Sequence, residues 1–99
     1  MSRPLLVEPE ALASWVAQHV RWHLDDNHLI GKFALSYNNS LDVLAMVRAN
    51  IDELDHHPRV TVEYGQLTVE LWTHDRGGVT SLDLQLAELF SSAVSAVSH

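Results

Sequence analysis

Two alternating segments in the second half of the chain constrain its fold more than any other feature. Apolar and polar residues alternate over residues 60–64 and again over residues 67–73, with only Gly65-Gln66 between the two runs. A period of two is typical of half-buried β-strands, and a two-residue loop that begins with glycine favours a type II′ hairpin. The expected register pairs Tyr64 with Leu67, Val62 with Val69 and Val60 with Leu71. One face of this hairpin is then apolar and the other polar, which predicts a sheet that is covered on one face only.

Helices and further strands are expected around the hairpin. Apolar residues recur at helical spacing in three segments, which predicts helices over residues 9–22, 41–55 and 81–97. A strand is expected over residues 28–37, and residues 21–24 are a candidate partner strand on the other side of a turn. Ser40 is expected to cap the second helix, and Thr80 and Asp83 to form a capping box on the third.

The order of these elements predicts the fold class. Helix, strands, helix, two strands and helix give an α+β domain with helices on one face of an antiparallel sheet. The chain has 99 residues and carries no internal repeat, linker or low-complexity tract. We therefore expect a single domain over residues 1–99.

Composition excludes several classes of function. The chain has 13 Asp and Glu residues against 6 Lys and Arg, a formal charge of −7, so no basic surface is expected for a nucleic acid or an anionic membrane. The absence of cysteine excludes disulfides, thiolate catalysis and cysteine-ligated metals. No apolar run approaches the roughly 20 residues that span a bilayer, and the first residues do not form a secretory signal. A cytoplasmic protein is expected.

Histidines gather where the predicted elements end. His56 and His57 close the second helix, His74 follows the last strand, and Asp83 opens the last helix. The hairpin register brings the residues just before Val60 close to those just after Leu71. We therefore expect the three histidines to share one edge of the sheet, where binding groups are commonly placed on a rigid scaffold.

This group of side chains suits general acid–base chemistry, because imidazole both donates and accepts protons near neutral pH. The helix dipole favours a cation at His56 and His57 and a carboxylate at Asp83. Two alternatives remain open at this point. The histidines and the aspartate can be plain helix caps, or three imidazoles and a carboxylate can bind zinc, although adjacent histidines in an extended segment diverge. His19 and His23 have the spacing of a helical metal pair but lack the glutamate of that motif.

A spaced motif in the chain resembles a known family. Asp52, three residues, His56-His57-Pro58, five residues, Tyr64, nine residues, His74, eight residues and Asp83 is similar to the signature of the pterin-4a-carbinolamine dehydratases. The context Thr73-His74, Gly77-Gly78-Val79-Thr80 and Leu86-Ala87 also resembles this family, as do Trp22 and Phe33-Ala34-Leu35. The resemblance covers roughly residues 12 to 90.

The resemblance implies a four-stranded antiparallel sheet with three helices on one face, in the order α-β-β-α-β-β-α. It implies a hydro-lyase that dehydrates 4a-hydroxytetrahydropterin to quinonoid dihydropterin in tetrahydrobiopterin recycling, without a metal or an organic cofactor. His56 and His74 would flank the 4a-hydroxyl group, and Asp83 would hold a neighbouring histidine. His57, Pro58 and Thr73 would contact the pterin, with His57 also counted among the catalytic side chains.

The resemblance also carries an alternative and two departures. The family forms homodimers and homotetramers, and some members act as dimerisation or assembly cofactors for a protein client rather than as enzymes. Arg59-Val60 replaces an acid and a bulkier residue of many members, and Trp72 replaces a small one. Since Trp72 falls on the polar face of the predicted hairpin, we expect it to lie in an interface between copies rather than in solvent.

Overall fold

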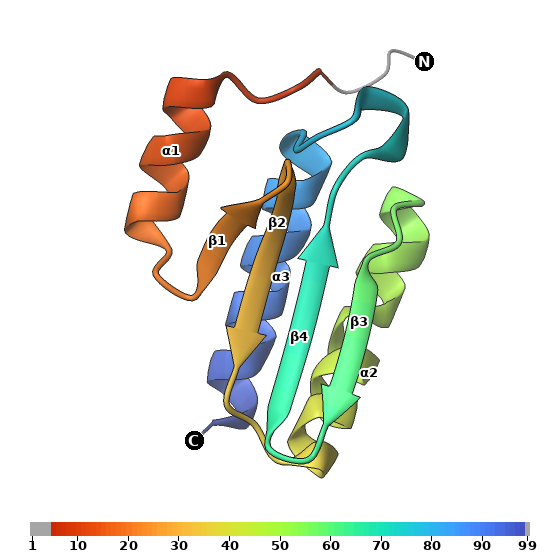
Figure 1. Cartoon of the computed structure of the whole chain (residues 1–99). Helices are drawn as coiled ribbons and strands as arrows, with labels where there is room; N and C mark the ends of the chain where they lie inside the picture. The colour runs from red at the N-terminus through yellow and green to blue at the C-terminus, as the bar shows by residue number, and fades with distance from the viewer. Residues whose placement is uncertain (1–4, 99) are drawn as a thin grey trace.

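The computed structural model describes residues 5–98, which form three α-helices, four β-strands and a short 3₁₀ helix. In chain order these are α1 (Pro9–Gln18), β1 (Trp22–Asp25), β2 (His28–Phe33), α2 (Tyr37–Leu54), β3 (Arg59–Glu63), β4 (Gln66–Leu71), η1 (His74–Arg76) and α3 (Ser81–Val97). Neighbouring strands are antiparallel, and the strand order is β1-β2-β4-β3 (Figure 1). The predicted α+β class and element order are confirmed.

One face of the sheet carries the hydrophobic core. α2 and α3 lie against this face, and α1 lies beside β1 (Figure 1). Every second residue of β2 and β4 is buried, and these side chains meet buried residues of the two helices: Leu29, Phe33, Leu67, Val69 and Leu71 from the strands, and Val43, Val47, Leu86 and Phe90 from the helices. Each such side chain contributes about 1.5–3 kcal/mol on burial. The residues that alternate with them on β4 are polar, and those on β2 are polar apart from Ile30, so the one-sided sheet is confirmed.

The hairpin forms with a register two residues away from the expected one. Val62 pairs with Leu67 and Val60 with Val69, and the turn is Tyr64-Gly65 instead of Gly65-Gln66. Gly65 occupies the second turn position with a φ of +87°, which is the position where a type II turn needs glycine. A shift of two residues keeps the same side chains on the same face, so the apolar face was predicted correctly although the pairs were not.

The second helix begins four residues before the expected start. Ser36 is its N-cap, and the Ser36 hydroxyl accepts a hydrogen bond of 3.1 Å from the backbone N–H of Asn39. Tyr37, expected at the end of a strand, is instead the first helical residue, and β2 ends at Phe33. Ser40 has no capping role, because its side chain is fully buried on the core side of the helix.

The first helix is shorter than expected, and the candidate partner strand over residues 21–24 forms as β1. α1 ends at Gln18, where the Nδ1–H of His19 donates to the carbonyl of Trp15 at 2.7 Å and satisfies an acceptor of the last turn. Trp22 therefore lies in β1, paired with Gly31. Its indole N–H donates to Ser91 Oγ at 2.9 Å, which ties the edge strand to α3.

On the open face of the sheet, Trp72 contacts the side chains of His28 and Arg59. The rings of His28 and Trp72 are stacked with centroids 4.1 Å apart, and the Arg59 guanidinium lies 5.2 Å from the Trp72 ring centroid. Glu70 bonds to His28 Nδ1 at 2.5 Å and lies 3.7 Å from Arg59 Nη1. Part of the Trp72 ring is thus covered by its own chain. Within residues 5–98, none of the helices has the length and apolar character needed to cross a membrane.

Candidate functional site

Two links that are distant in the sequence, from α2 to β3 and from β4 to α3, lie at the same end of the sheet (Figure 1). α2 stops at Leu54, and Asp55 adopts a left-handed conformation with a φ of +49°, which turns the chain towards β3. Because Arg59 pairs with Glu70, the residues just before β3 lie beside those just after β4. α3 begins at this end too, so the predicted convergence of the segments does not depend on the incorrect register.

The segment between β4 and α3 folds back on itself. The backbone N–H of Thr73 donates to the carbonyl of Gly78 at 2.8 Å, and Gly77 takes a φ of +69° that few other residues adopt. Leu6 then forms an isolated β-bridge with Thr80. These contacts bring Thr73 and Thr80 side by side at the N-terminus of α3.

Asp83 is the centre of the site. Its carboxylate is fully buried, and Oδ2 accepts hydrogen bonds from the Thr80 backbone N–H at 2.8 Å and from the Thr73 hydroxyl at 2.9 Å. The first of these bonds belongs to the predicted capping box, which is confirmed. The second oxygen, Oδ1, lies 2.5 Å from Nε2 of His56. Hydrogen bonds from its neighbours thus replace the solvent that the buried carboxylate lacks.

The bond to Asp83 fixes how the His56 ring carries its hydrogen. An ionised carboxylate only accepts hydrogen bonds, so Nε2 of His56 carries the hydrogen in this contact. In the neutral ring the other nitrogen, Nδ1, then holds a free lone pair. The side chain is 11% exposed, so the pair of side chains lies just below the surface.

His57 and His74 lie outside this hydrogen-bonded cluster. Both are exposed, His57 in the link between α2 and β3 and His74 as the first residue of η1. Pro58 is half-buried directly before β3, and Thr73 is 9% exposed with its hydroxyl turned towards Asp83. The structure thus joins His56, Thr73 and Asp83, and it leaves the rings of His57 and His74 open to solvent at the same end of the sheet.

The other histidines do not join the cluster. His19 follows the last residue of α1 and stacks on Trp15 with ring centroids 3.8 Å apart, and His23 is exposed on β1. Their spacing of four is therefore not that of a pair on one helix, contrary to the metal-pair alternative. In the part of the chain that the structure describes, no three His, Asp or Glu side chains are grouped as they would be around a metal ion.

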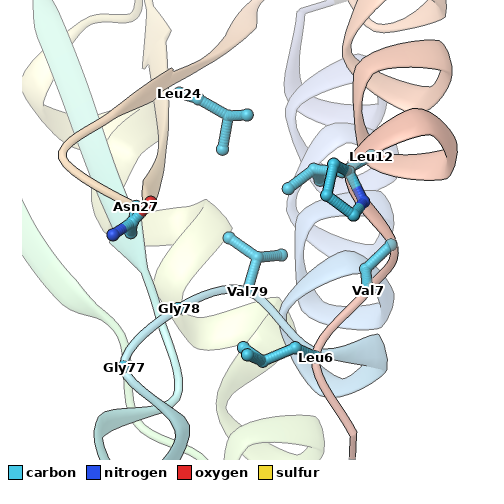
Figure 2. Close-up of a pocket in the computed structure, with 9 residues that line it drawn as sticks. Leu6, Val7, Leu12, Leu24, Asn27, Gly77, Gly78 and Val79 are labelled. Carbon is cyan, nitrogen blue, oxygen red and sulfur yellow. The ribbon is translucent and has the colours of Figure 1, made fainter.

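A pocket of about 340 Å³ lies beside the site, and the histidines do not line it. Leu6, Val7 and Leu12 face Leu24 and Val79 across it, and Gly77-Gly78 close one side (Figure 2). Its lining is apolar apart from Asn27 and backbone groups. The pocket borders the segment that joins β4 to α3 through Gly77, Gly78 and Val79, but none of its lining residues belongs to the histidine cluster.

The contacts of two groups of residues were not predicted from the sequence. Thr80 was expected only as a helix cap, although its hydroxyl lies 2.7 Å from that of Thr73 inside the cluster. His28 and Glu70 were not singled out at all. Their position on the polar face, flanking Trp72, is the signal that would have found them, and it required the correct pairing of β2 with β4.

Comparisons with known proteins indicate one family. The family model described as "Pterin 4 alpha carbinolamine dehydratase" matches residues 6–93. A protein of Metallosphaera sedula, provisionally named pterin-4-alpha-carbinolamine dehydratase, is 43% identical over 68 residues, which cover 68% of this chain and 71% of the relative. A protein of Prochlorococcus marinus with the same provisional name is 27% identical over 90 residues, or 90% of this chain and 95% of the relative.

A solved structure supports the fold. The crystal structure of a "transcriptional coactivator/pterin dehydratase" from Brucella melitensis superposes with a TM-score of 0.82 and 22% sequence identity, covering 90% of this chain and 98% of that one. At this level of identity the likeness concerns the arrangement of helices and strands.

Proposed function

The chain belongs to the pterin 4 alpha carbinolamine dehydratase family, and on this premise we propose that it dehydrates a 4a-hydroxytetrahydropterin to the quinonoid dihydropterin. In this reaction the bond between C4a and its hydroxyl oxygen breaks while a double bond forms between C4a and N5. The hydroxyl group gains a proton and leaves as water, and N5 loses its proton. The catalyst therefore has to supply one proton and accept another.

The observation that carries the proposal is the bond between His56 and buried Asp83. A neutral His56 ring held by Nε2–H presents the Nδ1 lone pair, which is a proton acceptor near neutral pH. Asp83 stabilises the positive charge that the ring gains when it takes up a proton, as an ion pair shielded from water does. His56 is thus suited to move a proton at the reacting centre.

We assign the complementary proton transfer to His74 and the orientation of the pterin to His57 and Pro58. His57 and His74 are both exposed, so a planar ligand can reach their rings from solvent. The nitrogen lone pair at N5 already assists loss of the hydroxyl group. Positioned acid and base groups that contribute about 10²–10⁴-fold are then sufficient for the reaction.

Stopped-flow measurement of the loss of 4a-hydroxytetrahydropterin tests the proposal. His74→Ala and His56→Gln are each expected to lower the rate at least about tenfold. Glutamine keeps an N–H group that can reach Asp83 but cannot exchange protons, so the fold is expected to stay intact. His23→Ala removes an exposed histidine of β1 and serves as the control. Wild-type rates in both His74→Ala and His56→Gln would contradict the proposal.

The physiological setting follows from the chemistry. A 4a-hydroxytetrahydropterin is the form in which a tetrahydropterin cofactor leaves an aromatic hydroxylation, so the chain would serve the recycling of tetrahydrobiopterin or a related pterin. We place it in the cytoplasm for that role.

A second candidate function is a non-catalytic role in the assembly of another protein. Tyr37 and Leu41, one turn apart on α2, are 49% and 45% exposed, and together they offer an apolar surface for a protein partner. The name of the Brucella melitensis structure pairs a coactivator with a dehydratase. Replacing both residues by serine would remove partner binding and leave dehydration unchanged if the two roles are separate.

A further inference from the structure

The contacts of the Thr73 and Thr80 hydroxyl groups favour one arrangement of hydrogens, because Asp83 Oδ2 lies 2.9 Å from the Thr73 hydroxyl and 3.5 Å from that of Thr80. Each hydroxyl carries one hydrogen, and that of Thr73 is directed to Asp83 Oδ2 at 2.9 Å. The Thr73 oxygen must then accept in its 2.7 Å contact with Thr80 Oγ1, so the Thr80 hydroxyl is the donor there. The hydrogen bonds run in one direction, from Thr80 to Thr73 and from Thr73 to Asp83.

The hydrogen bonds among Thr80, Thr73 and Asp83 are shielded from water. Thr80 and Asp83 are fully buried, and Thr73 is 9% exposed, so water does not compete for these groups. Oδ2 of Asp83 has a second donor in the Thr80 backbone N–H at 2.8 Å. Two donors at Oδ2 prevent the carboxylate from rotating, and this fixes the direction in which Oδ1 meets Nε2 of His56.

We propose that Thr73 is a positioning residue whose hydroxyl acts through Asp83 to hold His56 in its Nε2–H form, with Nδ1 presented for proton transfer. The family resemblance implies instead that Thr73 contacts the pterin. The structure favours the inward role, because the one hydrogen of the Thr73 hydroxyl is already donated to Asp83. The kinetic consequence rests on the proposed function, whereas the state of the His56 ring does not.

Nitrogen NMR of the histidine rings in the ligand-free protein tests the proposal without any assay of activity. In the wild type, His56 is expected to carry its hydrogen on Nε2 and a free lone pair on Nδ1. Thr73→Val has nearly the same shape and no hydroxyl, and it is expected to produce exchange between the two ring forms. Thr73→Ser restores a hydroxyl and is expected to restore the wild-type spectrum. A wild-type His56 spectrum in Thr73→Val would overturn the proposal.

Kinetics then separates the two roles of Thr73. A positioning role predicts that Thr73→Val lowers kcat about tenfold while KM changes by less than about twofold. A raised KM with unchanged kcat and an unchanged His56 spectrum would mean that Thr73 contacts the pterin, which would also overturn the proposal. If Thr73→Val does not fold, the wild-type spectrum decides, because a hydrogen on Nδ1 of His56 contradicts the geometry. A wild type that lacks dehydratase activity would refute the proposed function alone.

Discussion

Asp83 serves two purposes with one carboxylate, since it caps α3 through the Thr80 N–H and holds His56 through its other oxygen. Neither role needs the other, but both need an acceptor oxygen in a place without water. The donors around it replace the lost hydration, which is why a completely buried acid is tolerated here.

The first prediction concerns the carboxylate of Asp83. Asp83→Asn replaces one acceptor oxygen by an NH₂ group, so at least one of the three donors faces another donor. We expect the free energy of unfolding to fall by about 1–3 kcal/mol and the dehydration rate to fall with it. Urea denaturation measures the stability. Asp75→Asn, at an exposed position of η1, is the control, and equal stability of the two variants would contradict the role given to Asp83.

The positions of His56 and Asp83 were predictable from the sequence, because both lie at helix ends. His56 follows the end of α2, which Pro58 predicts, and Asp83 lies at the start of α3, which the capping box predicts. The inward turn of the Thr73 hydroxyl was not predictable. It depends on the left-handed Gly77 and on the β-bridge with Gly78, and such loop conformations are set by tertiary contacts that no local pattern records.

At the scale of the elements, two serines show how a helix start is misjudged. Ser36 and Ser40 both have the side chain of a good cap, but Ser36 precedes the weak helix formers Tyr37-Asn38-Asn39, whereas Ser40 precedes an apolar helical pattern. The helix begins one turn earlier than Leu41, and Ser40 lies inside it with its side chain buried in the core. Local cap preference and tertiary packing thus disagree, and packing decides.

The two serines give a second prediction. Ser36→Ala removes the hydrogen bond to the Asn39 N–H and is expected to cost about 0.5–2 kcal/mol of stability. Ser40→Ala removes a buried hydroxyl that has no hydrogen-bond partner in the part of the chain described, and alanine favours helices, so this variant is expected to be at least as stable as the wild type. Thermal unfolding of both variants decides, and the reverse order would restore Ser40 as the cap.

A third prediction concerns the contact between β1 and β2. A Cβ at Gly31 would lie 2.8 Å from the ring of Trp22, which is buried and hydrogen-bonded to Ser91. Gly31→Ala is therefore expected to destabilise the fold by about 1–3 kcal/mol through overpacking. Gly65→Ala is a useful comparison, since nothing lies within 4 Å and only its backbone conformation is strained. Denaturation midpoints measure both, and a neutral Gly31→Ala would mean that Trp22 moves freely.

At the scale of the whole molecule, the open face of the sheet has features of its own. Trp72 was expected in an interface between copies, and the chain itself covers part of the ring with His28 and Arg59. The assembly of the protein into dimers or tetramers stays a prediction. The face that Trp72 shares with Glu70 is still the one without a covering helix among the residues described.

The fourth prediction tests that face. Trp72→Ala is expected to lower the mass of the assembly in light scattering, and to cost about 0.5–1.5 kcal/mol of stability through loss of the stack with His28. Tyr64→Ala is the control, because Tyr64 is an aromatic residue at the hairpin tip with 97% exposure. If Trp72→Ala keeps the wild-type mass, the ring contributes to the single chain only.

The double duty of Asp83 has a consequence for how diverged relatives are read. A descendant that no longer needed the reaction would still need this aspartate to begin α3, so natural selection would retain it. Under the function proposed above, the exposed rings of His57 and His74 serve only the reaction, so these positions would change once the reaction was lost. In a genome survey, those two histidines would therefore distinguish relatives that retain the activity from relatives that have lost it, and the aspartate would not.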